Sequence, residues 1–234
     1  MPRAPGVHLL TPTVIVHVFA AEEPGPTALV QAGIHGDEIA GVHALEELLE
    51  EGALTPTRGR LLVIPRMNPP AVRARQRCAP GGLDLNRCFP GSADAEEPEL
   101  RLAHQFMQLV LDERPALMAT LHESQKRYHP EVKPSFGQTL VYGVEPRPPI
   151  LDRTIARLNA RFDSPEERWE SQYFPVATSS TEVIVDAVGC VGICVETWMG
   201  FSLARRVAMQ RAVVEFLLDD IGVRSLSTSA SAAV

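Results

Sequence analysis

Long apolar runs are missing from this 234-residue sequence, and cysteine and positive charge are scarce. The longest apolar run, residues 187–195, contains nine residues with two glycines, whereas about 18–20 apolar residues are needed to cross a bilayer. A signal peptide has a continuous apolar core followed by a cleavage site of small residues. Here the apolar N-terminal stretch is interrupted before any such site. We therefore expect no membrane-spanning segment and a cytoplasmic location.

The four cysteines are too few for a disulfide scaffold, and none of them forms a Cys-x-x-Cys pair. The sequence does not decide whether Cys78 and Cys88 form a disulfide. Lys and Arg together number 22 against 29 Asp and Glu, and this net charge of −7 argues against a nucleic-acid or anionic-membrane partner. The phosphate-binding pattern GxxxxGK[ST] and the nucleophile pattern GxSxG are both absent, so NTPases and α/β-hydrolases lose their usual signatures.

What remains is the composition of an ordinary globular protein, with 45% hydrophobic and 22% charged residues. Short Val- and Ile-rich runs predict strands, and apolar residues at three- and four-residue spacing predict helices. The alternation of the two predicts one α/β domain with a largely parallel or mixed sheet, at residues 1–223, followed by a disordered tail at 224–234. Strands are expected at 13–19, 27–33, 60–65, 116–121, 138–144 and 183–196, helices at 37–52, 98–113, 149–162 and 202–221, and long functional loops at 66–92 and 122–137.

A first candidate site is the sequence Gly-Ile-His-Gly-Asp-Glu at residues 33–38, where a predicted strand gives way to a helix. Ligands of open α/β sheets bind at such junctions. His35 and Glu38 are both ligand types that Zn²⁺ accepts, and Gly36 between them is expected to permit a sharp turn. In an isolated His-x-x-Glu motif, the Glu more often only complements the positive end of the helix dipole. A zinc site here therefore requires a further ligand.

His122 is the candidate for that third ligand, because it directly follows the predicted strand 116–121 and so lies at the same edge as His35. His43 and His104 fall within predicted helices, and His129 lies deep in a proline-flanked loop. Two imidazoles and one carboxylate with an open fourth position are typical of a catalytic zinc site.

Two more candidates carry opposite charge. Asn86 and Arg87 lie in the sequence Asp-Leu-Asn-Arg of the long loop, where an amide and a guanidinium together can bind a carboxylate. The loop also carries arginines at positions 73, 75 and 77, which suggests an anionic ligand. A plain alternative is a solvated turn with an Asp84–Arg87 ion pair. Glu196 ends an apolar strand and is expected to face a cleft, a metal or a cation, or simply water.

Together these segments resemble the zinc carboxypeptidase superfamily. The resemblance covers residues 27–200 and rests on the order in which the motifs occur along the chain. These are Gly-Ile-His-Gly-Asp-Glu at 33–38, Asn-Pro-Pro-Ala at 68–71, Asp-Leu-Asn-Arg at 84–87 with Phe-Pro-Gly at 89–91, His122 and Glu196. It implies a single three-layer α/β domain, with a mixed, mostly parallel sheet and helices on both faces. It also implies one zinc ion held by His35, Glu38 and His122, with Glu196 as general base, Arg77 polarising the scissile carbonyl, and Asn86 and Arg87 gripping a substrate carboxylate.

The activity that the resemblance implies is zinc-dependent hydrolysis of an amide or peptide bond next to a free carboxylate. The segment 68–91 is most similar to the succinylglutamate desuccinylase and aspartoacylase branch, which deacylates N-acyl amino acids. Residues 200–203 look like the carboxypeptidase continuation, and only one helix and a tail follow Glu196. The C-terminal β domain that narrows the aspartoacylase pocket is therefore expected to be missing, which favours small peptides as substrates. A deacylase and a non-catalytic zinc- or peptide-binding module are the alternatives.

Two departures from the family pattern remain. Thr120 stands where relatives often have an Asp that orients the third ligand. The active-site tyrosine of carboxypeptidases is not assigned among Tyr128, Tyr142 and Tyr173.

Overall fold

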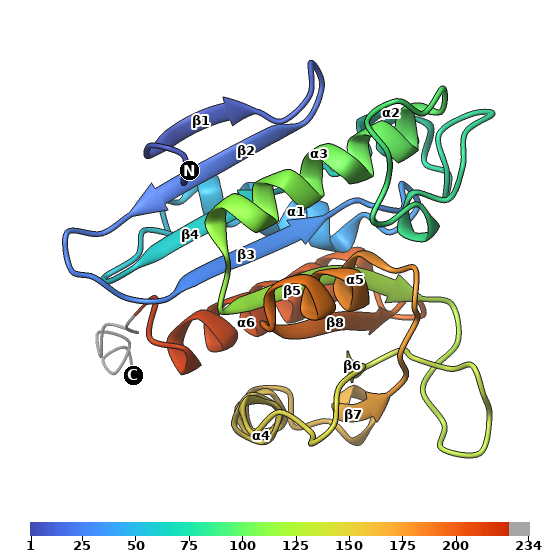
Figure 1. Ribbon diagram of the computed structural model, residues 1–234. Helices are drawn as coiled ribbons and strands as arrows, with labels where there is room; N and C mark the ends of the chain where they lie inside the picture. The colour runs from blue at the N-terminus through green and yellow to red at the C-terminus, as the bar shows by residue number, and fades with distance from the viewer. Residues whose placement is uncertain (225–234) are drawn as a thin grey trace.

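A computed structural model describes residues 1–224 and shows one mixed sheet flanked by helices (Figure 1). The eight strands of this part of the chain lie in the order β1-β2-β4-β3-β5-β8-β6-β7. The central strands β4, β3, β5 and β8 run parallel to one another, while β1, β2 and β6 pair antiparallel with their inner neighbours. The strands are β1 (Gly6–Leu9), β2 (Ile15–Ala20), β3 (Thr27–Ala32), β4 (Arg60–Ile64), β5 (Leu117–Ser124), β6 (Thr139–Tyr142), β7 (Glu170–Tyr173) and β8 (Val191–Trp198).

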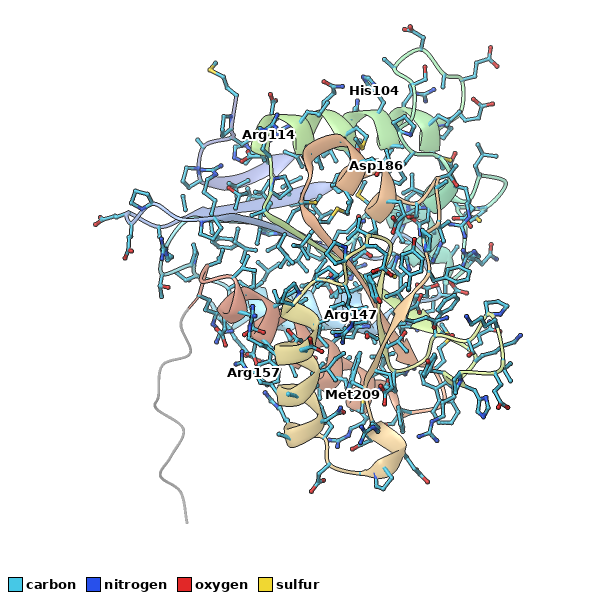
Figure 2. The ribbon with its side chains drawn as sticks, turned by 60° about the horizontal axis from the view of Figure 1, so that its bottom comes forward. His104, Arg114, Arg147, Arg157, Asp186 and Met209 are labelled. Atoms are coloured by element: carbon cyan, nitrogen blue, oxygen red, sulfur yellow. The ribbon has the colours of Figure 1, made fainter. Side chains whose placement is uncertain are left out.

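Helices cover both faces of the sheet, as Figure 1 shows. Helices α1 and α6 pack on one face with α4 beside α6, while α3 and α5 pack together on the other. Arg157 of α4, labelled in Figure 2, stacks 3.9 Å from the Phe216 ring centroid of α6. The helices are α1 (Ala40–Glu50), α2 (Pro69–Ala74), α3 (Pro98–Glu113), α4 (Ile150–Arg161), α5 (Ser180–Val188) and α6 (Leu203–Asp220), with short 3-10 helices at Leu85–Arg87 and Pro165–Glu167.

Alternation along the central strands divides the core into two layers. In β3, Ala28 and Val30 join the cluster beneath α1 and α6, whereas Leu29 between them joins the cluster beneath α3. Because parallel strands are buried on both faces, they read as continuous apolar runs in the sequence. The predicted class, a single α/β domain with a mixed sheet and helices on both faces, is confirmed.

One predicted element is wrong. The segment 183–196 was expected to be strand with a kink near Gly189, but residues 180–188 form helix α5 and only the part from Val191 is strand. Ser179 caps the helix by accepting a hydrogen bond from the Glu182 N–H at 3.2 Å, and Gly189 ends it in the left-handed conformation. A continuous apolar run cannot separate a short buried helix from a buried strand by periodicity alone.

The remaining differences lie at the edges and in the loops. Strands β1 and β7 were not expected; each contains four residues, and they form the two edges of the sheet. The loop 66–92 contains α2 and a 3-10 helix. Strand β5 extends to Ser124, so His122 lies within the strand rather than after it. Of the tail predicted at 224–234, only Arg224 lies within the described residues.

The carboxyl ends of β3, β5 and β8 meet at one edge of the sheet, together with the long loops (Figure 1). His122 of β5 pairs in register with Glu196 of β8. This edge therefore brings together residues that are far apart in sequence. Among the helices of residues 1–224, none is long and apolar enough to cross a membrane.

Candidate active site

The turn between β3 and α1 is held by two glycines that play different parts. Gly33 adopts a positive φ of 68°, which favours glycine. Gly36 lies so close to α2 that a Cβ atom there would meet the backbone carbonyl of Ala71 at 2.0 Å. The sharp turn expected at Gly36 therefore falls at Gly33, and Gly36 is required by close packing instead.

That turn brings His35 and Glu38 against His122. The ligand atoms of the three side chains all lie within 4.8 Å of one another. Glu38 bridges the two rings, with Oε1 at 2.8 Å from Nδ1 of His35 and Oε2 at 2.8 Å from Nδ1 of His122. All three side chains are buried, with 3–6% of their surface exposed.

Electrostatics within the cluster favour an ionised carboxylate. Burial disfavours the charge on Glu38, but the two imidazoles outweigh it and hold its pKa well below the ordinary value. Burial likewise opposes protonation of His35, yet Glu38 and Asp84 raise its pKa to about 9. Burial lowers the pKa of His122. One negative charge and two nitrogen donors thus converge on a single point, which is the donor set of a divalent zinc site.

Glu196 lies beside this cluster and lines the same cavity. Its Oε2 is buried and has no hydrogen-bond partner among the described residues, while Cys194 lies 3.8 Å from Oε1. Burial, followed by the charge of Glu38, raises the pKa of Glu196 well above its ordinary value. A carboxylate with a raised pKa and an oxygen that has no hydrogen-bond partner is suited to accept a proton.

The long loop places Arg77 over the cluster. Arg77 donates two hydrogen bonds to Asp84 Oδ2, at 2.9 and 3.1 Å, and lies 3.6 Å from Glu38 Oε1. Asp84 Oδ1 in turn lies 3.1 Å from Nε2 of His35. Asp84 therefore pairs with Arg77 and His35, and the alternative Asp84–Arg87 ion pair does not form.

Asn86 and Arg87 line the same cavity. Asn86 Oδ1 accepts a hydrogen bond from the Ser180 N–H at 2.9 Å, which ties the loop to the start of α5. The Arg87 side chain is exposed and, within residues 1–224, donates only to the backbone oxygen of Asn86, at 2.8 Å. Its guanidinium is thus available to an anion. Cys78 and Cys88 are free thiols, so the disulfide left open between them is not formed.

The cavity has a volume of about 310 Å³ and two kinds of wall. The polar part of the lining includes the cluster described above, and the apolar part is formed by Phe136, Val141, Phe174, Val176 and Met199. Arg73 and Arg75 lie outside it, as do all three tyrosines of the chain. A candidate tyrosine is therefore not found among the residues that line this cavity.

Sequence reasoning missed the residues that hold His122 in place. Gln210 of α6 donates to the His122 backbone oxygen at 2.8 Å. The adjacent Glu123 is buried, accepts the Ala40 N–H at 2.9 Å, and pairs with Arg206 of α6. Thr120, at the position where relatives often have Asp, contacts the Thr181 hydroxyl at 3.1 Å. The available signal for Glu123 was a charged residue beside His122 at the end of an apolar strand.

The segment that carries most of these residues is similar to known proteins. Residues 24–129 match the succinylglutamate desuccinylase/aspartoacylase catalytic domain. An 88-residue segment is 40% identical to N-alpha-acetyl-L-2,4-diaminobutyric acid deacetylase of Halomonas elongata, covering 37% of this chain and 25% of that protein. The chain thus matches about a quarter of the length of this curated relative.

Solved structures show the same fold over most of the chain. The tripeptide-bound cell shape determinant Csd4 of Helicobacter pylori superposes with a TM-score of 0.78 at 20% identity, covering 90% of this chain and 56% of that one. A succinylglutamate desuccinylase from Silicibacter superposes with a TM-score of 0.69 at 26% identity, covering 90% and 61%. The resemblance inferred from the motifs is therefore confirmed: residues 24–129 are similar to the catalytic domain of the succinylglutamate desuccinylase/aspartoacylase family.

Proposed function

We propose that this chain is a zinc-dependent hydrolase that cleaves the amide bond of an N-acyl amino acid bearing a free carboxylate. The observation that supports it most is the convergence of His35, Glu38 and His122 within 4.8 Å, with Glu196 in the same cavity. A pure binding module has no need of a buried, unpartnered carboxylate beside such a cluster.

In this proposal His35, Glu38 and His122 hold one zinc ion per chain. When bound, zinc acts as a Lewis acid and lowers the pKa of water. Glu196 accepts the proton of the attacking water and delivers it to the leaving amine, for which its raised pKa is suited. Arg77 is placed by Asp84 to donate to the oxygen on which negative charge develops.

The carboxylate of the substrate is assigned to Arg87 and Asn86. Arg87 has no acidic partner among the described residues, and a guanidinium binds a carboxylate with two parallel hydrogen bonds. Fixing the carboxylate there would hold the scissile bond near the zinc ligands, and such positioning contributes several kcal/mol to catalysis.

Two observations bear on the class of amide. The family match covers residues 24–129, which include the three proposed ligands, Arg77, Asn86 and Arg87, and it favours N-acyl amino acids. Fold similarity to Csd4, whose structures hold a tripeptide and whose activity is described as a D,L-carboxypeptidase, favours the second candidate, cleavage of small peptides. We rank the deacylase first because its support comes from sequence similarity over the site itself.

A hydrolysis screen of the zinc-loaded protein tests the proposal. N-acetyl and N-succinyl amino acids are compared with peptides carrying a free C-terminus, and Glu196→Gln serves as the control. We expect turnover of acyl amino acids and a loss of at least about 100-fold in Glu196→Gln. Turnover of peptides alone would select the second candidate, and turnover of neither, or undiminished turnover in Glu196→Gln, would contradict the proposed hydrolase.

A further inference from the structure

The apolar part of the cavity lining has no task in the proposed reaction. It is formed by five side chains, Phe136, Val141, Phe174, Val176 and Met199. The rings of Phe136 and Phe174 pack edge to face, with their centroids 5.0 Å apart. Their backbones are also held, because the Thr139 hydroxyl donates to the Phe136 oxygen at 2.7 Å and the Phe174 N–H donates to the Tyr142 oxygen at 2.9 Å. These five side chains, called the apolar surface below, are therefore in place before a substrate binds.

The order of the strands places the apolar surface beside Glu196. Strand β8 lies between β5 and β6, and β7 lies beyond β6 (Figure 1). Glu196 pairs with His122 of β5 on one side and with Thr139 of β6 on the other. Val141 lies on the same face of β6 as Thr139, and Phe174 directly follows β7. Because neighbouring strands lie about 4.8 Å apart, the apolar surface is within reach of a group attached to the bond that is cleaved.

The start of α5 connects the apolar surface to the proposed carboxylate site. Asn86 Oδ1 accepts the Ser180 N–H at 2.9 Å, and the Val176 oxygen accepts the N–H of the preceding Ser179 at 2.8 Å. Asn86 and Val176 both line the cavity. The carboxylate and the side chain of an amino acid branch from the same Cα atom. A carboxylate bound by Asn86 and Arg87 therefore leaves the substrate side chain, rather than the acyl group, next to the apolar surface.

The charges of the cavity match a substrate with a single carboxylate. Among the described residues that line it, Arg77 and Arg87 carry the two guanidinium groups, and none is a lysine. Arg77 is held by Asp84 through two hydrogen bonds and is assigned to the oxygen of the cleaved bond. Asp37 and Glu182 add negative charge to the same lining. A second substrate carboxylate would thus meet apolar side chains and acids, which makes its transfer from water costly.

We propose that the apolar surface selects N-acyl amino acids that carry one carboxylate and an apolar side chain, with Phe174 and Val176 as specificity-determining residues. The inference rests on the proposed function and names the substrate class of the same site. Derivatives of aspartate and glutamate are then poor substrates, although the matching family is described as succinylglutamate desuccinylase/aspartoacylase. All five side chains of the apolar surface lie outside that match, which ends at residue 129.

The test compares N-acetyl-L-leucine with N-acetyl-L-aspartate, whose side chain has a similar shape but ends in a carboxylate, and with N-acetyl-L-lysine. For the zinc-loaded protein, kcat/KM of the leucine derivative should exceed that of the aspartate derivative by at least about 100-fold. Val176→Lys places an ammonium group beside the apolar surface and should lower this ratio by about 10- to 100-fold. Val132→Lys changes an exposed valine outside the cavity and should leave the ratio within about threefold of the parent.

A second measurement does not depend on catalysis. Calorimetry of the zinc-loaded Glu196→Gln protein, in which turnover is not expected, should show tighter binding of the leucine derivative, and adding Val176→Lys should reduce this preference. A preference for the aspartate or lysine derivative, or a ratio that Val176→Lys leaves unchanged, would overturn the inference, while turnover itself would still support the hydrolase. Leucine-selective binding that Val176→Lys reduces, without turnover of any derivative by the parent protein, would support the inference and contradict the proposed hydrolase.

Discussion

At the scale of single residues, the unusual feature is one carboxylate shared between two imidazoles in a nearly dry site. Glu38 is only 6% exposed, so water does little to offset the cost of its charge, and its nearest side-chain partners are His35 and His122, at 2.8 Å each. The three side chains are therefore brought together by packing before any ion binds. Preorganisation of this kind is what a metal site requires of its ligands.

The ligand assignment predicts the effect of single substitutions. His35→Ala or His122→Ala should reduce bound zinc from about one ion per chain to nearly none, because a catalytic site with two protein ligands loses most of its affinity. Elemental analysis of the purified protein measures this. His43→Ala, a histidine of α1 outside the cavity, is the matched control and should retain the metal. Full zinc content in either ligand variant would remove that residue from the site.

Arg87 carries the second prediction at this scale. Arg87→Ala should raise the KM of an N-acyl amino acid by about 10- to 100-fold and leave kcat within a few-fold, because the lost interaction holds the substrate carboxylate in the ground state as well. Steady-state kinetics distinguish the two constants. Arg73→Ala removes an arginine of the same loop that lies outside the cavity, and its KM should stay near that of the parent. An unchanged KM in Arg87→Ala would place the carboxylate elsewhere.

At the scale of elements, the site depends on a register that no single motif contains. Strands β5 and β8 pair in parallel so that His122 lies opposite Glu196 and Glu123 lies opposite Thr197. Alternation turns Glu123 to the other face, where it receives the first N–H of α1 and pairs with α6. The strand thus presents a ligand on one face and is anchored to two helices on the other.

This arrangement explains which parts of the molecule were predictable from the sequence. The central strands and the turn carrying His35 and Glu38 are local patterns, since apolar runs end in polar residues at the sheet edge. Helix α5 was not predictable because a buried helix of nine residues has the same composition as a buried strand. The contacts of Glu123 and Gln210 with distant helices have no local pattern, so their roles emerge only from packing.

The buried pair between Arg206 and Glu123 leads to a prediction at this scale. Arg206→Ala should lower the free energy of unfolding by about 3–5 kcal/mol, because it leaves the fully buried Glu123 carboxylate without its cation. Urea unfolding followed by circular dichroism measures the loss. Arg211→Ala, on the same helix, breaks pairs with the exposed Glu47 and Glu51 and should cost at most about 1 kcal/mol. Equal losses in the two variants would show that Glu123 is stabilised by its other hydrogen bonds.

At the scale of the whole molecule, two apolar layers enclose the central strands and the cavity opens at their carboxyl edge. The proposed ligands come from the β3–α1 turn and from β5, and Glu38 and His122 are 84 residues apart along the chain. They meet only when the sheet has formed. A metal ion that binds them therefore binds the folded state far better than the unfolded chain.

Zinc should accordingly stabilise the fold as a whole. At a free zinc concentration of 100 times Kd, binding to the folded state alone adds about 2.7 kcal/mol. For a domain of this size, each kcal/mol shifts Tm by about 2–4 °C, so the expected rise over the chelator-treated protein is about 5–10 °C. Thermal unfolding with and without added zinc measures it, and His122→Ala, which keeps the same surface histidines and cysteines, should show no such rise. An equal rise in that variant would mean that the metal acts at another site, because stabilisation through this cluster requires both imidazoles.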